Sequence, residues 1–257
     1  MAGKHKSILK TAGTFAAMSL LALSMAGAAQ PPAKPSPEKP PQGKPVGEKK
    51  ADSAAGDMVR LKVDLPKAMY TGTPKNIRSE NLEPPRRPGE VREMPLVPQG
   101  TVNLALRKRV TSSDKEPIIG EVELITDGDK DAKDGCFVEF GPGQQWVQID
   151  LGAKSDIHAI LIWHYHGEGR VYRDVIIQIA DDPDFVTGVK TVFNNDHDHT
   201  AGMGAGKDKE YIESNEGKMI VCKGAQARYV RLYSSGNTSN DMNHYTEVEV
   251  YGNPLSR

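Results

Sequence analysis

The chain has 257 residues, of which 26% are charged and 6% aromatic, and its formal net charge is −1 at pH 7. This near-neutral balance excludes a general basic face with interleaved aromatic side chains, so nucleic acid is not an expected partner. The charge excludes little else.

Residues 1–28 have the three parts of a secretory signal peptide: lysines, then an apolar run from Phe15, then the small residues Ala26-Gly27-Ala28. A membrane anchor is the alternative, but the run is short, rich in alanine and interrupted by two serines. No cysteine follows it directly, and no later segment approaches about 18 uninterrupted apolar residues. We expect cleavage near Ala28 and a protein that is secreted, periplasmic or on the cell surface, with no transmembrane segment after cleavage.

Residues 29–57 are rich in proline and lysine, and they contain too little apolar surface to form a core. Proline favours an extended polyproline II conformation, and the lysines outnumber the acidic residues between Gln30 and Lys50. We predict a disordered, basic linker. Weak attraction to acidic polymers of the cell envelope is the functional alternative.

Residues 58–100 are predicted to form an extended arm over the following domain, with one added strand. Met58–Leu65 alternates apolar and polar residues with period two, as a half-buried strand does. The stretch 66–98 is broken by prolines and therefore excludes a regular element. The sequence gives this arm no functional interpretation.

From residue 101 onward the pattern is all-β. Ile157–Trp163 is apolar on both faces apart from His158, which favours a central strand, and one helical turn is expected at Asp181–Phe185. The predicted strands are Leu104–Thr111, Glu121–Ile125, Cys136–Phe140, Gln145–Leu151, Ile157–Trp163, Asp174–Ala180, Thr191–Phe193, Met219–Cys222, Arg228–Tyr233 and Glu247–Tyr251. Trp146 and Trp163 stand in strands, so core or sheet-face packing is expected for both.

Five segments in this order carry a family resemblance: Asn103–Leu106, Thr126–Asp129, Gln144–Gly152, Ala227–Tyr233 and Tyr245–Gly252. Together they resemble the discoidin domain, also called the coagulation factor five/eight type C domain, of the galactose-binding-like family. The resemblance implies an antiparallel jelly-roll β-sandwich over residues 101–252. It also implies a ligand-binding domain, often one for sugars.

The clustered carboxylates of 127–131 suit a hard cation such as calcium. In sugar-binding members of the resembled family, this loop and the glutamate that opens the last strand share a structural metal. The resemblance thus implies a calcium site at Asp127, Asp129 and Glu247, with backbone oxygens near Leu124 and Thr246. The segment Asp134–Phe137 departs from the family pattern, and a solvated acidic turn is the alternative.

Three polar loops are predicted to converge at one end of the sandwich, because loops leave a jelly roll at only two ends. Their side chains supply the directional donors and acceptors that a hydroxyl-rich ligand needs, and the family uses histidine, arginine or asparagine, and an aromatic residue in such loops. Polar surface turns are the alternative for any single histidine. The candidate ligand-binding residues are His164, His166, Arg170, Asn194, His197, His199, Asn243 and His244.

The sequence therefore predicts an exported, non-catalytic binding module for a glycan or cell-envelope polysaccharide. Two alternatives remain. The His-x-His pairs at 164/166 and 197/199, with Asp196 and Asp198, are compatible with a zinc-dependent hydrolase, although His-Glu-x-x-His is absent. A structural envelope or adhesion protein is the other, and it would expose an apolar patch.

Cys136 and Cys222 are the two cysteines of the chain. An oxidising compartment allows them to form one disulfide, and two separate buried thiols are the alternative. The sequence leaves both open.

Overall fold

The computed structural model describes residues 57–75, 77–87 and 90–255. The predicted signal peptide lies outside the described residues, as does the predicted linker except for Asp57. Among the residues that are described, no helix has the length and apolar character needed to cross a membrane.

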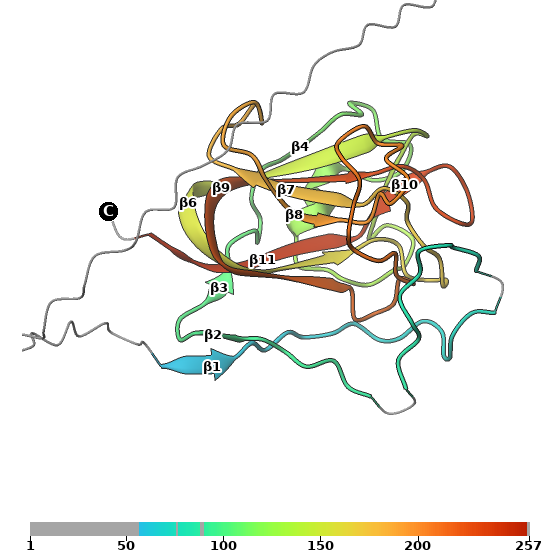
Figure 1. Ribbon diagram of the computed structural model, residues 1–257, viewed down its shortest axis with the longest axis horizontal. Coiled ribbons are helices and arrows are strands. Elements are labelled where there is room, and N and C mark those ends of the chain that lie inside the picture. The colour runs from blue at the N-terminus through green and yellow to red at the C-terminus, as the bar shows by residue number, and fades with distance from the viewer. Residues whose placement is uncertain (1–56, 76, 88–89, 256–257) are drawn as a thin grey trace, which may run out of the picture. The chain divides into compact units, whose positions relative to one another are not determined.

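The described residues form an all-β structure with one short 3-10 helix, as the sequence predicts (Figure 1). The strands are antiparallel throughout their named pairings. In chain order the elements are β1 Met58–Arg60, β2 Leu96–Pro98, β3 Val102–Asn103, β4 Val110–Ser112, η1 Val122–Thr126, β5 Val138–Phe140, β6 Gln145–Trp163, β7 Ile176–Ala180, β8 Lys190–Asn194, β9 Lys218–Ser234, β10 Asn243–Tyr245 and β11 Glu247–Pro254.

Two long strands, β6 and β9, pair along almost their whole length and bend together near their middle. Their pairing stops at Asp150 opposite Tyr229 and resumes at Ser155 opposite Ala227. Gly152 lies inside this interruption with a φ of 86°, a conformation that glycine adopts at no steric cost. Bulged strands bend and twist more strongly, and here the bend folds one sheet into two layers.

The two halves of β6 have different neighbours. Val147–Ile149 pairs with β4, whereas Ile157–Trp163 pairs with β11, and β3 continues that layer beyond β11. On the other side of β9, its C-terminal half pairs with β7, and β7 pairs with β8. Figure 1 shows β6 and β9 curving at one end of the domain, with β4, β7 and β8 above and β3 and β11 below.

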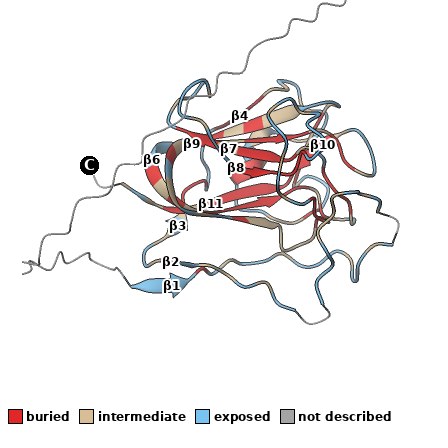
Figure 2. Ribbon diagram, in the orientation of Figure 1, coloured by how far each residue is buried: buried red, intermediate tan, exposed pale blue. Residues whose placement is uncertain are grey.

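The main core fills the space between the two layers. It consists of alternate residues of the strands, such as Ile149, Ile160, Val230 and Val248, each with no exposed surface. Figure 2 shows this burial concentrated on the facing sides of the layers. A well-packed interior of this kind is what a domain of about 150 residues needs for stability.

A second, smaller core lies on the outer face of the lower layer, where the arm covers it. Leu61, directly after β1, and Val97 of β2 are buried against Ala159, Leu161 and Trp163 of β6. Trp163 has no exposed surface, so its predicted packing role is confirmed. Because β6 is apolar on both faces here, the arm removes from water a face that would otherwise be exposed.

The sequence and the structure differ in several elements. The predicted strand Glu121–Ile125 is the 3-10 helix η1, since a short apolar run alone does not distinguish the two. The four predicted strands in 145–163 and 218–234 are the two halves of β6 and β9. The predicted helical turn at 181–185 is a non-helical turn, and the Asp182 side chain accepts hydrogen bonds from the amides of Asp184, Val186 and Thr187.

Shortened or unpredicted strands make up the remaining differences. The predicted strand Met58–Leu65 pairs only over β1, and Leu104–Thr111 only at its end, as β4. Three strands, β2, β3 and β10, stand where no strand was predicted. All three have two or three residues, too few for alternation to be visible.

The arm residue Leu61, which is 5% exposed, provides a test of the second core. We expect Leu61→Ala to lower the free energy of unfolding by about 2–4 kcal/mol, because it leaves a cavity beside Trp163. Urea unfolding followed by tryptophan fluorescence measures this. Leu65→Ala is the matched control: Leu65 is 47% exposed, and its loss should cost less than about 0.5 kcal/mol. Equal effects of the two variants would show that the arm does not contribute a core.

Candidate functional site

The bend in β6 and β9 brings both ends of β6 to one end of the sandwich. Gln145 pairs with Ser234 there, and the Ser234 hydroxyl donates to the Asn243 side chain at 2.8 Å. At the other end of β6, the Trp163 carbonyl accepts from the Thr246 amide at 2.8 Å. The short strand β10 therefore lies next to both ends of β6, and the loops that follow β6, β8 and β9 leave the sandwich near it (Figure 1).

A cluster of aromatic and polar side chains occupies this end, and we call it the His244 cluster. Tyr165 lies at its centre: its ring centroid is 4.9 Å from Phe137 and 6.0 Å from His244, and the Arg170 guanidinium lies 4.7 Å from it. Tyr165 is also the partly exposed ring of the group. The members of the cluster are Phe137, Glu139, Tyr165, Arg170, Tyr172 and His244.

His244 is held by its cross-strand neighbour. The register of β10 on β5 places it opposite Glu139, and its Nε2 lies 2.9 Å from Glu139 Oε2. Burial, followed by the nearby Arg170 and His164, lowers the pKa of His244 to about 4, so the ring is neutral at pH 7. A neutral ring that donates from Nε2 to a carboxylate carries no hydrogen on Nδ1. That Nδ1 is buried and has no hydrogen-bond partner among the described residues, which leaves it as a free acceptor.

Arg170 supplies the matching donor. It is 7% exposed, it stacks on Tyr165, and its Nη2 donates to Glu168 at 3.0 Å. Its Nε is buried and finds no partner in the described part of the chain, and the same is true of the Tyr172 hydroxyl. Buried polar atoms are rarely left unpaired in proteins, so three in one cluster require an explanation.

A buried contact between a histidine and a glutamate supports the cluster from behind. His164 and Glu213 have no exposed surface, and His164 Nδ1 lies 2.5 Å from Glu213 Oε1. The His164 ring stacks on Tyr172, with centroids 4.3 Å apart and planes 17° apart. The Glu213 amide donates to the Arg170 carbonyl at 2.9 Å. Glu213 thus fixes both the ring beneath Tyr172 and the backbone of Arg170.

The arm contacts the same loop. The Tyr70 hydroxyl donates to the Glu213 carbonyl. A Cβ on Gly169, next to Arg170, would clash with the ring of Pro74, so the arm passes against this glycine at close range. The arm therefore forms part of the support of the His244 cluster.

His166 connects this loop to the predicted metal loop. It is fully buried, and its Nε2 lies 2.8 Å from the Lys130 carbonyl. In the metal loop, Asp127 and Asp129 are exposed, whereas Glu247 has no exposed surface. Glu247 Oε2 accepts from the Gly128 amide at 3.2 Å, so the glutamate reaches the backbone of the loop, but the side-chain oxygens of Asp127, Asp129 and Glu247 do not all lie within 4.8 Å of one another.

Asn194 and Asn243 shape the loops. Asn243 Oδ1 accepts from Ser234 and Gly236, and its Nδ2 donates to the carbonyls of Gly141 and Gly143. Asn194 donates to the Gly204 carbonyl and accepts from the Asp196 amide. The amide oxygen and the amide nitrogen of both side chains therefore already form hydrogen bonds within the protein.

His197 and His199 are exposed and lie away from the His244 cluster. His197 lines a separate hollow, and His199 Nδ1 accepts from the Gly204 amide at 3.1 Å. Oxygens of Asp174, Asp196 and Asp198 all lie within 4.8 Å of one another. In the described ranges this is the only such group of three potential metal ligands, and it contains no histidine.

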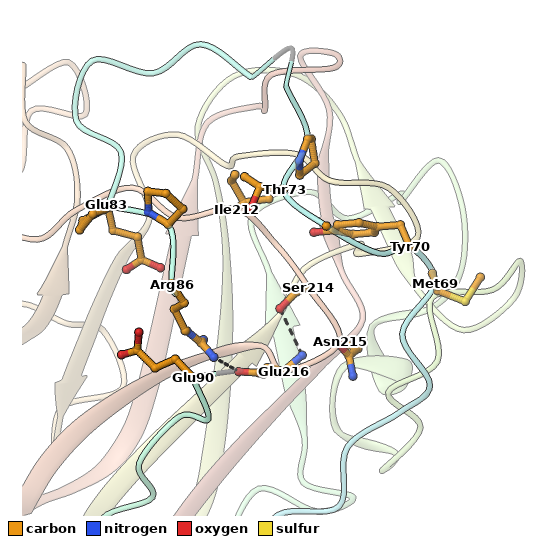
Figure 3. A pocket seen from close by; sticks show the side chains of 14 residues that line it. Met69, Tyr70, Thr73, Glu83, Arg86, Glu90, Ile212, Ser214, Asn215 and Glu216 are labelled. Atoms are coloured by element: carbon orange, nitrogen blue, oxygen red, sulfur yellow. Dashed lines mark hydrogen bonds and ion pairs between the residues drawn. The ribbon is translucent and has the colours of Figure 1, made fainter. Parts of the chain in front are cut away.

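A further groove lies between the arm and the loop before β9, with a volume of about 370 Å³. Figure 3 shows Tyr70 and Thr73 on one wall, Arg86 and Glu90 on another, and Ile212 behind. Arg86 forms an ion pair with Glu216, and both residues line the groove.

Sequence reasoning missed five residues of this site. Phe137, Glu139, Tyr165, Tyr172 and Glu213 were not predicted as site residues. The position of Tyr165 between two candidate histidines was an available signal. Glu139 could be found only from the pairing of β5 with β10, and nothing local in the sequence marks Glu213.

Both cysteines are free thiols in the structure, so of the two alternatives the separate thiols hold. Cys222 packs against the main core, and burial raises its pKa to about 12. Cys136 follows the acidic loop of residues 127–131, with its Sγ 3.3 Å from Asp129 Oδ2.

Residues 124–232 match the family model described as F5_F8_type_C_2, NedA-like, galactose-binding domain. The predicted resemblance to the discoidin family is confirmed for this segment. No curated protein matches the chain significantly.

Several solved structures have a similar fold. One is CBM32 of AlyQ in complex with 4,5-unsaturated mannuronic acid, with 21% identity, 55% of this chain and 92% of that chain covered, and a TM-score of 0.40. Another is a fucose binding module, SpX-3, of Streptococcus pneumoniae, with 19% identity, coverages of 58% and 97%, and a TM-score of 0.40. A family 89 glycoside hydrolase from Clostridium perfringens has 19% identity and a TM-score of 0.44; the match covers 60% of this chain and 15% of the hydrolase. At these values none of the three identifies a ligand of this chain.

The carboxylate group around Asp174 makes stability depend on pH. Burial, then Asp196 and Asp198, raise the pKa of Asp174 to about 6, whereas its value in an unfolded chain is about 4. Between about pH 4 and pH 6, Asp174 is protonated in the folded state and ionised in the unfolded state. The free energy of unfolding therefore falls as the pH rises through this range.

We expect Asp174→Asn to stabilise the fold by about 1 kcal/mol at pH 7.5 and by much less at pH 4.5, after allowance for solvent screening. Asparagine also tolerates the left-handed backbone at this position, where φ is 52°. Urea unfolding at both pH values measures the difference. An equal effect at the two values would show that Asp174 titrates normally.

Proposed function

We propose that this protein is a non-catalytic carbohydrate-binding module whose ligand binds at the His244 cluster. The observation that carries the proposal is the set of buried atoms in this cluster without a hydrogen-bond partner in the described structure: His244 Nδ1, Arg170 Nε and the Tyr172 hydroxyl. The match of residues 124–232 to a galactose-binding domain model supports the carbohydrate-binding function independently, and it does not bear on the location, since His244 lies outside the matched residues.

The chemistry of the cluster suits a sugar. A neutral imidazole nitrogen accepts a hydrogen bond from a hydroxyl, a guanidinium donates one, and a phenol does either. Phe137 and Tyr165 supply flat apolar surfaces for the C–H face of a sugar ring. Because the three unpaired atoms are buried, a ligand would reach them only after Tyr165, the partly exposed ring of the cluster, moves aside. If the protein is exported, as residues 1–28 predict, its partner is a glycan or a cell-envelope polysaccharide.

The binding test uses a glycan array followed by titration with methyl β-galactoside. We expect Arg170→Ala and His244→Ala each to weaken binding about 5- to 150-fold, because each leaves a ligand hydroxyl unpaired. Arg170→Lys keeps the positive charge at this position and so should fold. It should still lose affinity, because an ammonium group lacks the planar set of donors that the guanidinium presents. Arg87→Ala, at an exposed position in the arm, is the control.

Unchanged affinity of the folded variants would place the ligand elsewhere. No turnover of any bound glycan is expected. Hydrolysis that depends on zinc and is lost in His197→Ala or His199→Ala would instead support the hydrolase alternative.

We also propose that Asp127, Asp129 and Glu247 hold a structural calcium ion. Glu247 is fully buried, and its Oε1 has no partner among the residues described. An unpaired buried carboxylate is costly unless a cation or a proton neutralises it. The adjacent loop carries the two aspartates, and its Gly128 amide already contacts Glu247. Calcium would supply the positive charge that this oxygen-rich group lacks.

Removal of calcium should lower the melting temperature. Calcium at 100 times its Kd stabilises a folded protein by about 2.7 kcal/mol. Glu247→Gln should lose this response to calcium, whereas Asp134→Asn, at an exposed position in the same loop, should keep it. The measurement is thermal unfolding in calcium and in chelator at equal ionic strength. Identical transitions of the unmodified protein in the two buffers would exclude the site.

A further inference from the structure

A second hollow, with a volume of about 750 Å³, lies at the same end of the domain, and none of its lining residues belongs to the His244 cluster. Three separate segments build its walls. They are residues 77–80 of the arm, Arg173 and Asp174 before β7, and His197, Asp198 and Thr200 after β8, with Glu210 and Thr238 completing the lining.

Two short chain segments join this hollow to the His244 cluster. Arg173 lines the hollow and Arg170 belongs to the cluster; Glu210 lines the hollow and Glu213 bonds to the Arg170 backbone. Three residues span at most about 10 Å even when fully extended. The first connection places the Cα atoms of Arg170 and Arg173 within about 10 Å of each other, and the second does the same for Glu210 and Glu213, which contacts the cluster through the Arg170 backbone.

The walls of the hollow are held by hydrogen bonds of the backbone. The Glu210 amide donates to the Asn81 carbonyl at 3.1 Å, and the Glu83 amide donates to the Glu210 carbonyl at 2.8 Å. On the opposite side, the Thr238 amide donates to the Val171 carbonyl at 2.9 Å. The arm wall is thus fixed to the domain, so the hollow is largely preformed, as ligand sites usually are.

The side chains around the hollow are suited to hydroxyl groups. Arg78, Arg173 and His197 are exposed donors, and Asp198 is an exposed acceptor. Within the described structure, none of these four takes part in an ion pair shorter than 4 Å. No phenylalanine, tyrosine or tryptophan lines the hollow, so a ligand here is recognised mainly by hydrogen bonds.

We propose that this hollow is a second subsite, which binds the following units of an oligosaccharide whose first unit occupies the His244 cluster. The proposal rests on the carbohydrate-binding function and extends it to longer glycans. The lining carries four carboxylates, on Glu80, Asp174, Asp198 and Glu210, against two arginines. This acidic excess disfavours uronic acids by repulsion, so the ligand class is a neutral oligosaccharide.

The test compares short and long ligands on the full chain. Calorimetric titrations use methyl β-galactoside and galactotrioses with 1,3, 1,4 and 1,6 linkages. We expect one trisaccharide to bind tighter than the monosaccharide. Arg78→Ala and His197→Ala should weaken that trisaccharide about 5- to 30-fold and leave the monosaccharide unchanged. Arg87→Ala is matched to Arg78→Ala, since it removes an exposed arm arginine that does not line the hollow.

The possible results separate the two proposals. If the monosaccharide binds but no trisaccharide binds tighter, or if Arg78→Ala weakens both ligands equally, the subsite is wrong and the His244 cluster stands. If no ligand binds, both proposals are overturned. A trigalacturonide that binds as tightly as the neutral trisaccharide would contradict the assigned ligand class.

Discussion

The joint bend of β6 and β9 is the constraint on which the rest of the domain depends. If the two strands ran straight, Gln145 and Trp163 would lie at opposite ends of one flat sheet, since 19 residues of strand extend about 60 Å. The interruption between Asp150 and Ser155 folds this sheet into two layers and returns both ends of β6 to the same place. Loops that are far apart in the sequence then meet around β10, and this is how Phe137, Arg170 and His244 come together.

Glu213 has a comparable role at the level of side chains. It is a buried acid whose three hydrogen bonds go to different parts of the molecule: His164 through its carboxylate, Arg170 through its amide and Tyr70 of the arm through its carbonyl. Breaking a buried pair by removal of one partner is costly, because the other is left without compensation. The arm is therefore coupled to the loop that carries Arg170, although the matched family segment, 124–232, does not include the arm.

The sequence could predict those features that depend on local pattern. Alternation identified most of the long strands, and the polar loops identified His164, His166, Arg170 and His244, which the structure places in or beside one cluster. Contacts that depend on the pairing of strands far apart in the chain could not be predicted from the sequence. Glu139 and His244 face each other only because β5 pairs with β10, and β10 is three residues long. Asn243 and His244 are both polar and adjacent in the sequence, but their environments differ. The pairing of β10 with β5 places Asn243 against the Gly141 and Gly143 carbonyls, to which its Nδ2 donates, whereas His244 Nδ1 has no partner among the described residues.

The two proposed binding functions share one connection. His164 and His166 stand in the loop after β6, which is the ligand loop of the proposal, and His166 Nε2 lies 2.8 Å from the carbonyl of Lys130 in the acidic loop of residues 127–131. Lys130 is in turn held by an ion pair with Glu249, two residues beyond Glu247. A cation held by Glu247 and the aspartates would fix the acidic loop, and through the Lys130 carbonyl it would fix the position of the ligand loop. Coupling of this kind is reciprocal. If the cation raises the affinity for the sugar by some factor, the sugar raises the affinity for the cation by the same factor.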